Sequence, residues 1–229
     1  YFGGVYPQGK AVVTGYPVRT ELVQRARNRA AARADLARSL GRPLNEWNAP
    51  LLLVWGGSLG SRNINLNMWK ALPDVLPHAH VLHVVGTRDW EEYMTAPGPI
   101  PDLSPALAAR YHPVPYLHDE MSLALAAADL SLARAGASTL GEFPVAHLPS
   151  VLVPLLSVNQ QANADLLANH GGAIVIPDDE LGARLTPVLV DLLRDSEARD
   201  RMEANLRKLA RPDASHAIAR EIVALGACK

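Results

Sequence analysis

Three stretches of the chain combine small residues with polar side chains, and each follows a short apolar run. They read "GGSLGSRNIN" (56–65), "RAGASTLGE" (134–142) and "PLLSVNQQANADLL" (154–167). Glycines allow a backbone to approach a ligand closely, and the N–H groups at the start of a helix attract phosphate oxygens. Carboxylate and amide side chains can bind sugar hydroxyls. These residue types therefore fit a site for a sugar nucleotide.

Each stretch also has an interpretation without a ligand. The residues from Thr139 to Glu142 fit a capping box, in which the glutamate accepts from the backbone N–H of the threonine. The first stretch fits a tight turn between a strand and a helix. Its spacing matches neither G-x-G-x-x-G nor the Walker pattern, so it does not indicate a nicotinamide cofactor or ATP. The amides of the third stretch fit a capped helix start, with Asn163 facing solvent.

Other clusters of polar residues do not predict metal or carboxylate chemistry. His78, His80 and His83 lie close in sequence, but no acidic or cysteine partner joins them at a zinc-ligand spacing. The acidic residues 119–120 and 178–180 are typical of the first turn of a helix, where carboxylates favour the helix dipole. We therefore expect no metal and no cofactor.

The elements that must position these stretches are six apolar runs that alternate with helical patterns. The runs span residues 51–55, 81–86, 111–117, 130–136, 150–156 and 172–178. This alternation predicts an α/β fold with a Rossmann-like, doubly wound parallel sheet of about six strands. Ligands of such sheets bind outside the carboxyl ends of the strands, which is where the three stretches fall.

Helices are also expected before and after these six runs. Residues 25–38 are rich in alanine and arginine and predict a helix before the first strand. Its arginines form either a solvated face or a contact with anionic lipid. Residues 179–229 predict two or three helices, with Pro212 separating two of them.

Composition limits the function classes further. The 229 residues are 48% hydrophobic and 20% charged, and a net charge of −1 gives no global field for nucleic acid. No apolar run reaches the roughly 18 residues of a membrane span, and no signal peptide is visible. Cys228 is the only cysteine, so a disulfide within the chain is excluded. The opening residues lack an initiator methionine and read as the end of a preceding domain, so we expect a fragment.

In this order, the motifs resemble the C-terminal half of the MurG family, the UDP-N-acetylglucosamine transferases that make lipid II for peptidoglycan. The carriers are "VTGYPVR", "GGSLGSRNIN", "YLHDEM", "RAGASTLGE" and "NQQANADLL", from about Val13 to about Ile176. The resemblance implies the C-terminal domain of a GT-B fold. Residues 1–20 would end the N-terminal domain and form the linker, and residues 21–229 would form the domain that binds the UDP-sugar donor.

The resemblance implies two sets of contacts to that donor. On the phosphate side, Arg19, Gly57 and Ser58 would contact the diphosphate, and Asn65 would help to shape the site. A second turn on that side would consist of Gly136, Ala137 and Ser138.

On the uridine and sugar side, Leu117 would hold uracil through its backbone and Glu142 would bind the ribose hydroxyls. Asn159 and Gln160 would face the hydroxyls of the GlcNAc moiety.

Four departures from the family pattern affect donor specificity. Tyr16 stands where the family has asparagine, and Leu59 replaces a glutamine beside the phosphates. The "YLHDEM" loop is one residue longer, which can move the uracil position by one. Asn159 stands where glutamine or histidine is common, so its reach toward the sugar is shorter.

The function implied is transfer of GlcNAc from UDP-GlcNAc to lipid-linked MurNAc-pentapeptide, which converts lipid I to lipid II. The family's general base and membrane patch belong to the N-terminal domain. We therefore expect no catalytic residue in this chain, and donor binding without efficient transfer. The expected location is cytoplasmic, at the inner face of the bacterial cell membrane, with no nucleic-acid partner. Two alternatives stay open: another GT-B enzyme that acts on a glycolipid or natural product, and a noncatalytic donor-binding subunit.

Overall fold

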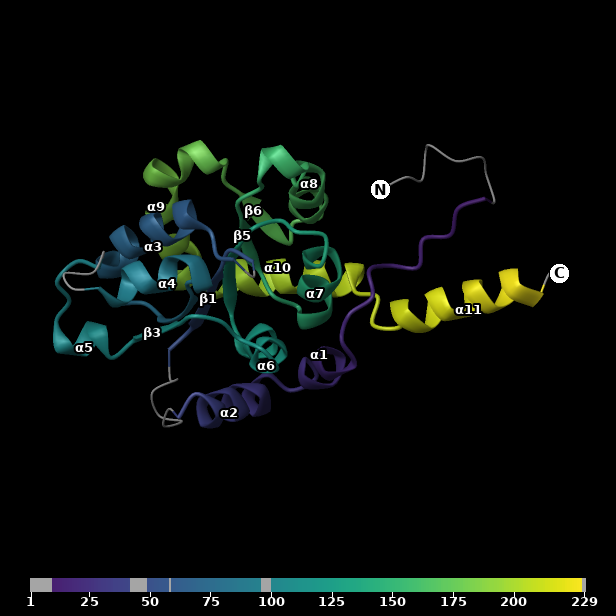
Figure 1. Cartoon of the computed structure of the whole chain (residues 1–229), viewed down its shortest axis with the longest axis horizontal. Helices are drawn as coiled ribbons and strands as arrows, with labels where there is room; N and C mark the ends of the chain where they lie inside the picture. The colour runs from purple at the N-terminus through teal and green to yellow at the C-terminus, as the bar shows by residue number, and fades with distance from the viewer. Residues whose placement is uncertain (1–9, 42–48, 58, 96–99, 228–229) are drawn as a thin grey trace.

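Six parallel strands form one sheet in the centre of the molecule (Figure 1). The computed structural model describes residues 10–41, 49–57, 59–95 and 100–227. The order of the strands is β3-β2-β1-β4-β5-β6. Their bounds are β1 Leu51–Trp55, β2 His80–Val84, β3 Tyr111–Val114, β4 Leu130–Ala133, β5 Ser150–Leu152 and β6 Ala173–Val175. This arrangement confirms the predicted α/β fold and the doubly wound parallel sheet.

The strands form from the apolar runs because both faces of the sheet are covered by helices. In β1, Leu51 and Leu53 belong to one core cluster, and Leu52 and Val54 belong to the other. All four side chains are fully buried. A central parallel strand therefore consists of continuous apolar residues rather than an alternating pattern.

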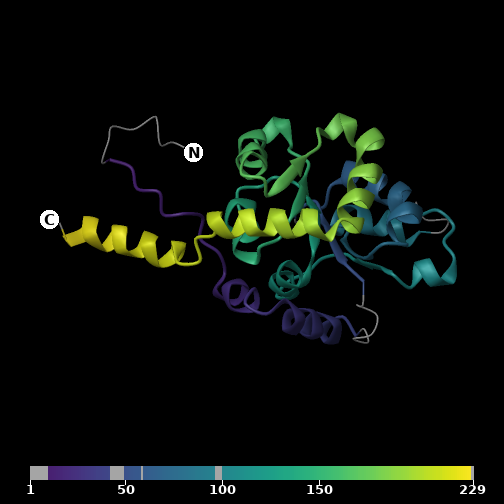
Figure 2. The same ribbon diagram turned by 180° about the vertical axis from the view of Figure 1, so that it is seen from behind.

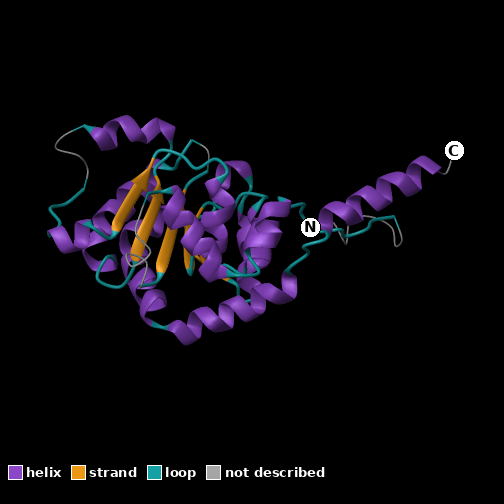
Figure 3. Cartoon of the chain, turned by 90° about the horizontal axis from the view of Figure 1, so that it is seen from below, coloured by secondary structure: helices purple, strands orange, loops and turns teal. Residues whose placement is uncertain are grey.

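Helices cover both faces of the sheet (Figure 3). Those whose buried side chains join the cluster of Leu51 and Leu53 are α1 Thr20–Arg25, α2 Arg29–Ser39, α6 Glu120–Ala127, α7 Thr139–Ala146 and α8 Gln161–Asn169. Those packed on the opposite face are α3 Arg62–Val75, α4 Thr87–Met94, α5 Pro105–Ala108 and α9 Leu181–Arg194. Helix α10, Ser196–Leu209, contributes Leu206 to one cluster and Met202 to the other. Two short 3-10 helices span Leu156–Val158 and Asp178–Glu180.

The predicted helix over residues 25–38 is two helices, because α1 ends at Arg25 and α2 begins after Asn28. The Asn28 side chain accepts from the N–H of Ala31 and so caps the second helix. Arginines of this region bind the domain itself. Arg33 donates to the carbonyl of Ala127 and to Asp129, and Arg25 donates to Ser122. These contacts attach α1 and α2 to the rest of the domain, a role that sequence analysis did not predict.

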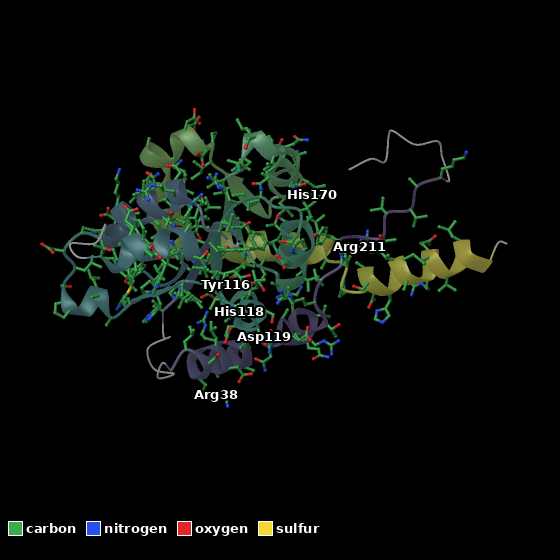
Figure 4. The ribbon with its side chains drawn as sticks, in the orientation of Figure 1. Arg38, Tyr116, His118, Asp119, His170 and Arg211 are labelled. Atoms are coloured by element: carbon green, nitrogen blue, oxygen red, sulfur yellow. The ribbon has the colours of Figure 1, made fainter. Side chains whose placement is uncertain are left out.

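Residues 179–229 were predicted to form two or three helices, and the described ones among them form three: α9, α10 and α11, which spans Ala214–Ala227. Helix α11 follows α10 after a break that contains Pro212. Helix α11 and the described N-terminal residues extend together from the body of the molecule (Figures 1 and 2). Gly15 contacts Arg211 at this junction, since a Cβ on Gly15 would lie 2.7 Å from the Cβ of Arg211 (Figure 4). Within the described residues, no helix has the length and apolar character that crossing a membrane requires.

Candidate functional site

The sheet has its topological switch point between β1 and β4: strands β2 and β3 follow on one side of β1, and β4, β5 and β6 follow on the other. The loops that carry the predicted motifs begin near this point. Strand β1 pairs with β2 on one side and with β4 on the other. The loop after β1 leads to α3 on one face of the sheet, and the loop after β4 leads to α7 on the other. A crevice for a ligand is expected where such loops separate, outside the carboxyl ends of the strands.

The Gly-rich turn after β1 is held by backbone contacts. Gly57 and Gly60 have φ values of 96° and 79°, and the N–H of Gly60 donates to the carbonyl of Gly57 at 3.0 Å. A Cβ on Gly60 would lie 2.2 Å from the carbonyl oxygen of Val85, whereas one on Gly57 would meet nothing within 4 Å. The turn is therefore packed at Gly60 and open at Gly57. Ser58 lies outside the described residues.

Glu142 lies in the first turn of α7 and makes no capping box. The N-cap of α7 is Ser138 rather than Thr139, and no side chain caps the helix. The hydroxyl of Thr139 donates to the carbonyl of Gly136 at 2.6 Å. Glu142 Oε2 is buried and has no hydrogen-bond partner in the described part of the chain. A buried carboxylate oxygen without a partner costs free energy, so it needs another explanation than helix capping.

The turn from Gly136 to Ser138 precedes this helix and is open to a ligand. A Cβ on Gly136 would meet no atom within 4 Å, and Ala137 is exposed. The Ser138 side chain makes no capping hydrogen bond. Trp55, the last residue of β1, packs edge-on against Phe143 of α7, with ring centroids 6.4 Å apart. Its Nε1 is a second buried polar atom without a partner among the described residues.

The loop after β5 is tied to the loop after β4. Asn163 Nδ2 donates to the carbonyl of Ala135 at 3.0 Å, so Asn163 does not simply face solvent. Gln160 is the N-cap of α8 but caps nothing; its Oε1 instead accepts from the N–H of Leu155 at 3.1 Å. Asn159 is exposed and has a left-handed φ of 53°. The side chain of Asn159 and the Nε2 group of Gln160 remain available for a ligand.

Arg19 and Leu117, two further predicted contacts, come from other parts of the chain. Arg19 is exposed at the N-cap of α1, and α1 packs against α7. The residues before Arg19 touch the start of α7, since a Cβ on Gly141 would lie 2.8 Å from Cγ1 of Val18. Leu117 follows β3, and its side chain is buried in the core, so only its backbone can meet a ligand.

Tyr116 and His118, which flank Leu117 in the sequence, are labelled in Figure 4. Their rings contact each other with centroids 4.7 Å apart.

Asn65 is buried beneath the Gly-rich turn rather than exposed in the crevice. Its exposed fraction is 0%, and its Nδ2 donates to the carbonyl of Val85 and to Asp89, both at 2.8 Å. Its Oδ1 lies 3.0 Å from Nε2 of His83. The structure therefore separates Asn65 from the other predicted donor contacts, because every polar atom of this amide is already bonded.

Arg134 is a residue of the site that sequence analysis did not single out. Its Nε donates to the hydroxyl of Ser61 at 3.0 Å, and its guanidinium forms an ion pair with Asp178. Asn63 Nδ2 also donates to Asp178, at 2.8 Å. Arg134 thus joins the loops after β1, β4 and β6. A charged residue inside the apolar run 130–136 was the available signal, but its partner is distant in sequence.

The arrangement suits an anionic, hydroxylated ligand. Two turns with open backbone, at Gly57 and Gly136, and the starts of α3 and α7 can donate backbone N–H groups to phosphate oxygens. The carboxylate oxygen of Glu142 that has no partner among the described residues can accept from hydroxyls. From the adjacent loop, the side chain of Asn159 can accept or donate, and Nε2 of Gln160 can donate. In the described residues, no three His, Cys, Asp or Glu side chains are grouped as a metal ion requires.

Comparison with known families supports this interpretation. Residues 51–218 match the family described as "Glycosyltransferase family 28 C-terminal domain". Two relatives carry the name UDP-N-acetylglucosamine--N-acetylmuramyl-(pentapeptide) pyrophosphoryl-undecaprenol N-acetylglucosamine transferase. The one from Roseiflexus sp. (strain RS-1) is 37% identical over 92% of this chain and 50% of its own length. The one from Salinibacter ruber is 38% identical over 96% of this chain and 56% of its own length. The chain thus spans about half the length of these relatives.

Solved structures show the same fold. MurG of Acinetobacter baumannii is similar with a TM-score of 0.63 and 24% identity, over 96% of this chain and 58% of that one. The UDP-GlcNAc 2-epimerase of Neisseria meningitidis, solved bound to UDP-GlcNAc, has a TM-score of 0.64 at 13% identity, over 96% of this chain and 56% of that one. At these identities the likeness concerns the fold alone.

Proposed function

Because this chain belongs to the glycosyltransferase family 28 C-terminal domain family, we propose that it binds the UDP-sugar donor of a MurG-like glycosyltransferase. The donor is UDP-N-acetylglucosamine, the sugar nucleotide in the names of its relatives. The whole protein transfers GlcNAc to lipid-linked MurNAc-pentapeptide, converting lipid I to lipid II. Residues 21–229 are the donor-binding domain, and residues 1–20 are the end of the preceding domain and the linker.

Glu142 is the observation that carries the proposal. Among the described residues its buried Oε2 has no partner, at the start of the helix that follows the central strand β4. In our proposal this oxygen accepts from the vicinal ribose hydroxyls of the nucleotide, as acidic residues do in dinucleotide-binding folds. The ligand then supplies the hydrogen bonds that the free protein lacks.

The diphosphate lies between the two open turns. Gly57 and Ser58 on one side, and the turn from Gly136 to Ser138 on the other, donate backbone N–H groups to its oxygens. Arg19 adds a positive charge from the start of α1. Stabilisation of the charge that develops on the leaving diphosphate is the contribution of this chain to catalysis.

Uridine and sugar extend to opposite sides of the diphosphate. The backbone at Leu117 holds uracil, and Asn159 and Gln160 hold the hydroxyls of the sugar. Asn65 shapes the site from below without touching the ligand.

In the reaction, the acceptor hydroxyl attacks the anomeric carbon of the donor. A bond forms from the acceptor oxygen to this carbon, and the bond from the carbon to the diphosphate oxygen breaks with inversion. The proton of the acceptor passes to a base outside these residues. UDP is the leaving group, and the two turns described above hold its diphosphate. The substrate chemistry places the reaction at the cytoplasmic face of the cell membrane, where the whole protein is peripheral.

Calorimetric titration of the 229-residue chain tests the proposal. UDP-GlcNAc, UDP-Glc, UDP and NAD are titrated into the wild type and into Glu142→Ala. We expect UDP-GlcNAc to bind in preference to UDP-Glc and NAD. Glu142→Ala should weaken binding by about 1–3 kcal/mol, as expected for lost hydrogen bonds to a charged group.

Asp165→Ala is the matched control, because Asp165 is an exposed carboxylate of α8. Its hydrogen bond in the described part of the chain stays within its own helix, to Gln161. Its removal should leave the affinity unchanged. Equal affinity for UDP-Glc would favour another GT-B donor specificity. If no uridine nucleotide binds to the folded wild type, the proposal is wrong.

A further inference from the structure

A chain of buried polar groups lies beneath the Gly-rich turn, on the α3 side of the sheet. Trp69 Nε1 donates to Tyr111 Oη at 3.0 Å, and Tyr111 Oη lies 2.8 Å from Nδ1 of His83. His83 Nε2 in turn lies 3.0 Å from Oδ1 of Asn65. These four side chains come from α3, β2 and β3, and all four are buried.

Asn65, at one end of this series of side chains, fixes the direction of each hydrogen bond. Both amide hydrogens of Asn65 are used, on the carbonyl of Val85 and the carboxylate of Asp89, and neither oxygen can donate in return. Asn65 Oδ1 must therefore accept, so His83 carries its proton on Nε2. Its Nδ1 accepts from the hydroxyl of Tyr111. Burial lowers the pKa of His83 to about 3, which keeps the imidazole neutral, as this pattern requires.

The Val85–Gly86 backbone that Asn65 holds supports two loops of the site. On one side is Gly60, because a Cβ on Gly86 would lie 2.3 Å from the Cα of Gly60. On the other side, the N–H of Gly86 donates to the carbonyl of Pro115 at 3.0 Å, two residues before Leu117. A shift of Val85–Gly86 would therefore move the phosphate-side turn and the uracil-side loop together.

We propose that Asn65 and His83 are positioning residues, which set the Gly-rich turn and the loop after β3 at the spacing that a nucleoside diphosphate requires. They act through the Val85 carbonyl and do not touch the ligand. The inference rests on the proposed function, because it assigns the two loops to one nucleotide. It adds the buried residue His83, and it names the contact through which the buried Asn65 shapes the site.

His83→Phe is the test, and His80→Phe is its matched control. Both substitutions replace a buried imidazole of β2. His80 is the first residue of this strand and hydrogen-bonds to His112, whereas His83 hydrogen-bonds to Asn65. Two quantities are measured on the whole chain: the Kd for UDP by calorimetry, and the hydrogen exchange of the Gly60 and Gly86 amides by NMR without ligand. We expect His83→Phe to raise the Kd about tenfold, as for a lost hydrogen bond, and to speed exchange at both amides. His80→Phe should leave both quantities near the wild type even where it lowers the melting temperature equally.

His83→Gln covers the case in which His83→Phe does not fold. Its amide can still donate to Asn65 Oδ1, so it should restore most of the protection at Gly60 and most of the affinity. The inference is wrong if loss of the His83 imidazole changes neither quantity, or if His80→Phe changes both as much. If the wild type does not bind UDP, the proposed function fails instead, and the exchange at Gly60 and Gly86 still decides whether these residues position the loops.

Discussion

Among single residues, Glu142 is the one for which a structural role and a ligand-binding role predict different effects of a substitution. A capping glutamate stabilises the free protein, whereas a carboxylate buried without a partner does not. We expect Glu142→Ala to leave the free energy of unfolding in urea unchanged or raised, while donor affinity falls. A capping role would instead lower the free energy of unfolding by about 1 kcal/mol. Such a loss, with unchanged affinity, would contradict the ligand role.

Two buried histidines make the stability depend on pH. Burial lowers the pKa of His80 to about 4 and that of His83 to about 3, from a value of 6.5. Below pH 6.5 the unfolded chain therefore binds more protons than the folded one, and the free energy of unfolding falls as the pH falls. The loss approaches about 1.4 kcal/mol per pH unit for His83 alone.

Urea unfolding at pH 7.5, 6 and 5 measures this slope, in a range in which most carboxylates stay ionised. His83→Gln removes one of the two titrating groups and should flatten the curve. A stability that stays constant from pH 7.5 to pH 5 would show that these imidazoles are not held neutral.

At the scale of elements, two loops meet through glycine backbone. Gly60 and Gly86 both have a positive φ, and neither has room for a Cβ. We expect Gly60→Ala to destabilise the fold by more than the roughly 1–2 kcal/mol of left-handed strain, because the methyl group would also meet the Val85 carbonyl. Thermal unfolding and urea titration measure the difference.

Gly41→Ala is the control for strain alone. Gly41 has a φ of 68°, and a Cβ there would meet nothing within 4 Å. Equal destabilisation by Gly41→Ala and Gly60→Ala would mean that the contact with Val85 adds nothing. The difference between the two losses of stability therefore measures the contact with Val85 alone, without the cost of the left-handed backbone.

At the scale of the whole molecule, these 229 residues should bind the donor without transferring it. They span about half the length of the curated relatives that they match. The described site binds and orients, but offers no base for the acceptor hydroxyl in our proposal. We expect the chain alone to bind UDP-GlcNAc and to produce no lipid II from lipid I, measured with radiolabelled UDP-GlcNAc. Transfer at the rate of a full-length MurG would contradict this division of labour.

Local sequence patterns were enough to predict the alternation of strands and helices and the three loops at the carboxyl ends of the strands. Hydrophobic burial on both faces requires continuous apolar strands, and glycine or small residues mark the turns that follow them. These are local signals, readable within about ten residues. The strands are shorter than predicted because the apolar runs continue past the last ladder hydrogen bond, as at 150–156, where β5 ends at Leu152.

Which polar side chains meet depends on how the elements pack in three dimensions. The side chains of Asn65, in α3, and His83, in β2, are hydrogen-bonded to each other. Arg134 pairs with Asp178, which lies 44 residues further along the chain. Glu142 fitted a capping box in sequence, but the N-cap of α7 is Ser138 rather than Thr139. Oε2 of Glu142 is instead buried without a partner among the described residues. Burial, which sets the pKa of His83 and the cost of an unpartnered oxygen, depends on elements far apart in the chain. No local pattern carries that information, so the burial and the hydrogen bonds of Asn65, His83 and Glu142 are known only from the assembled sheet.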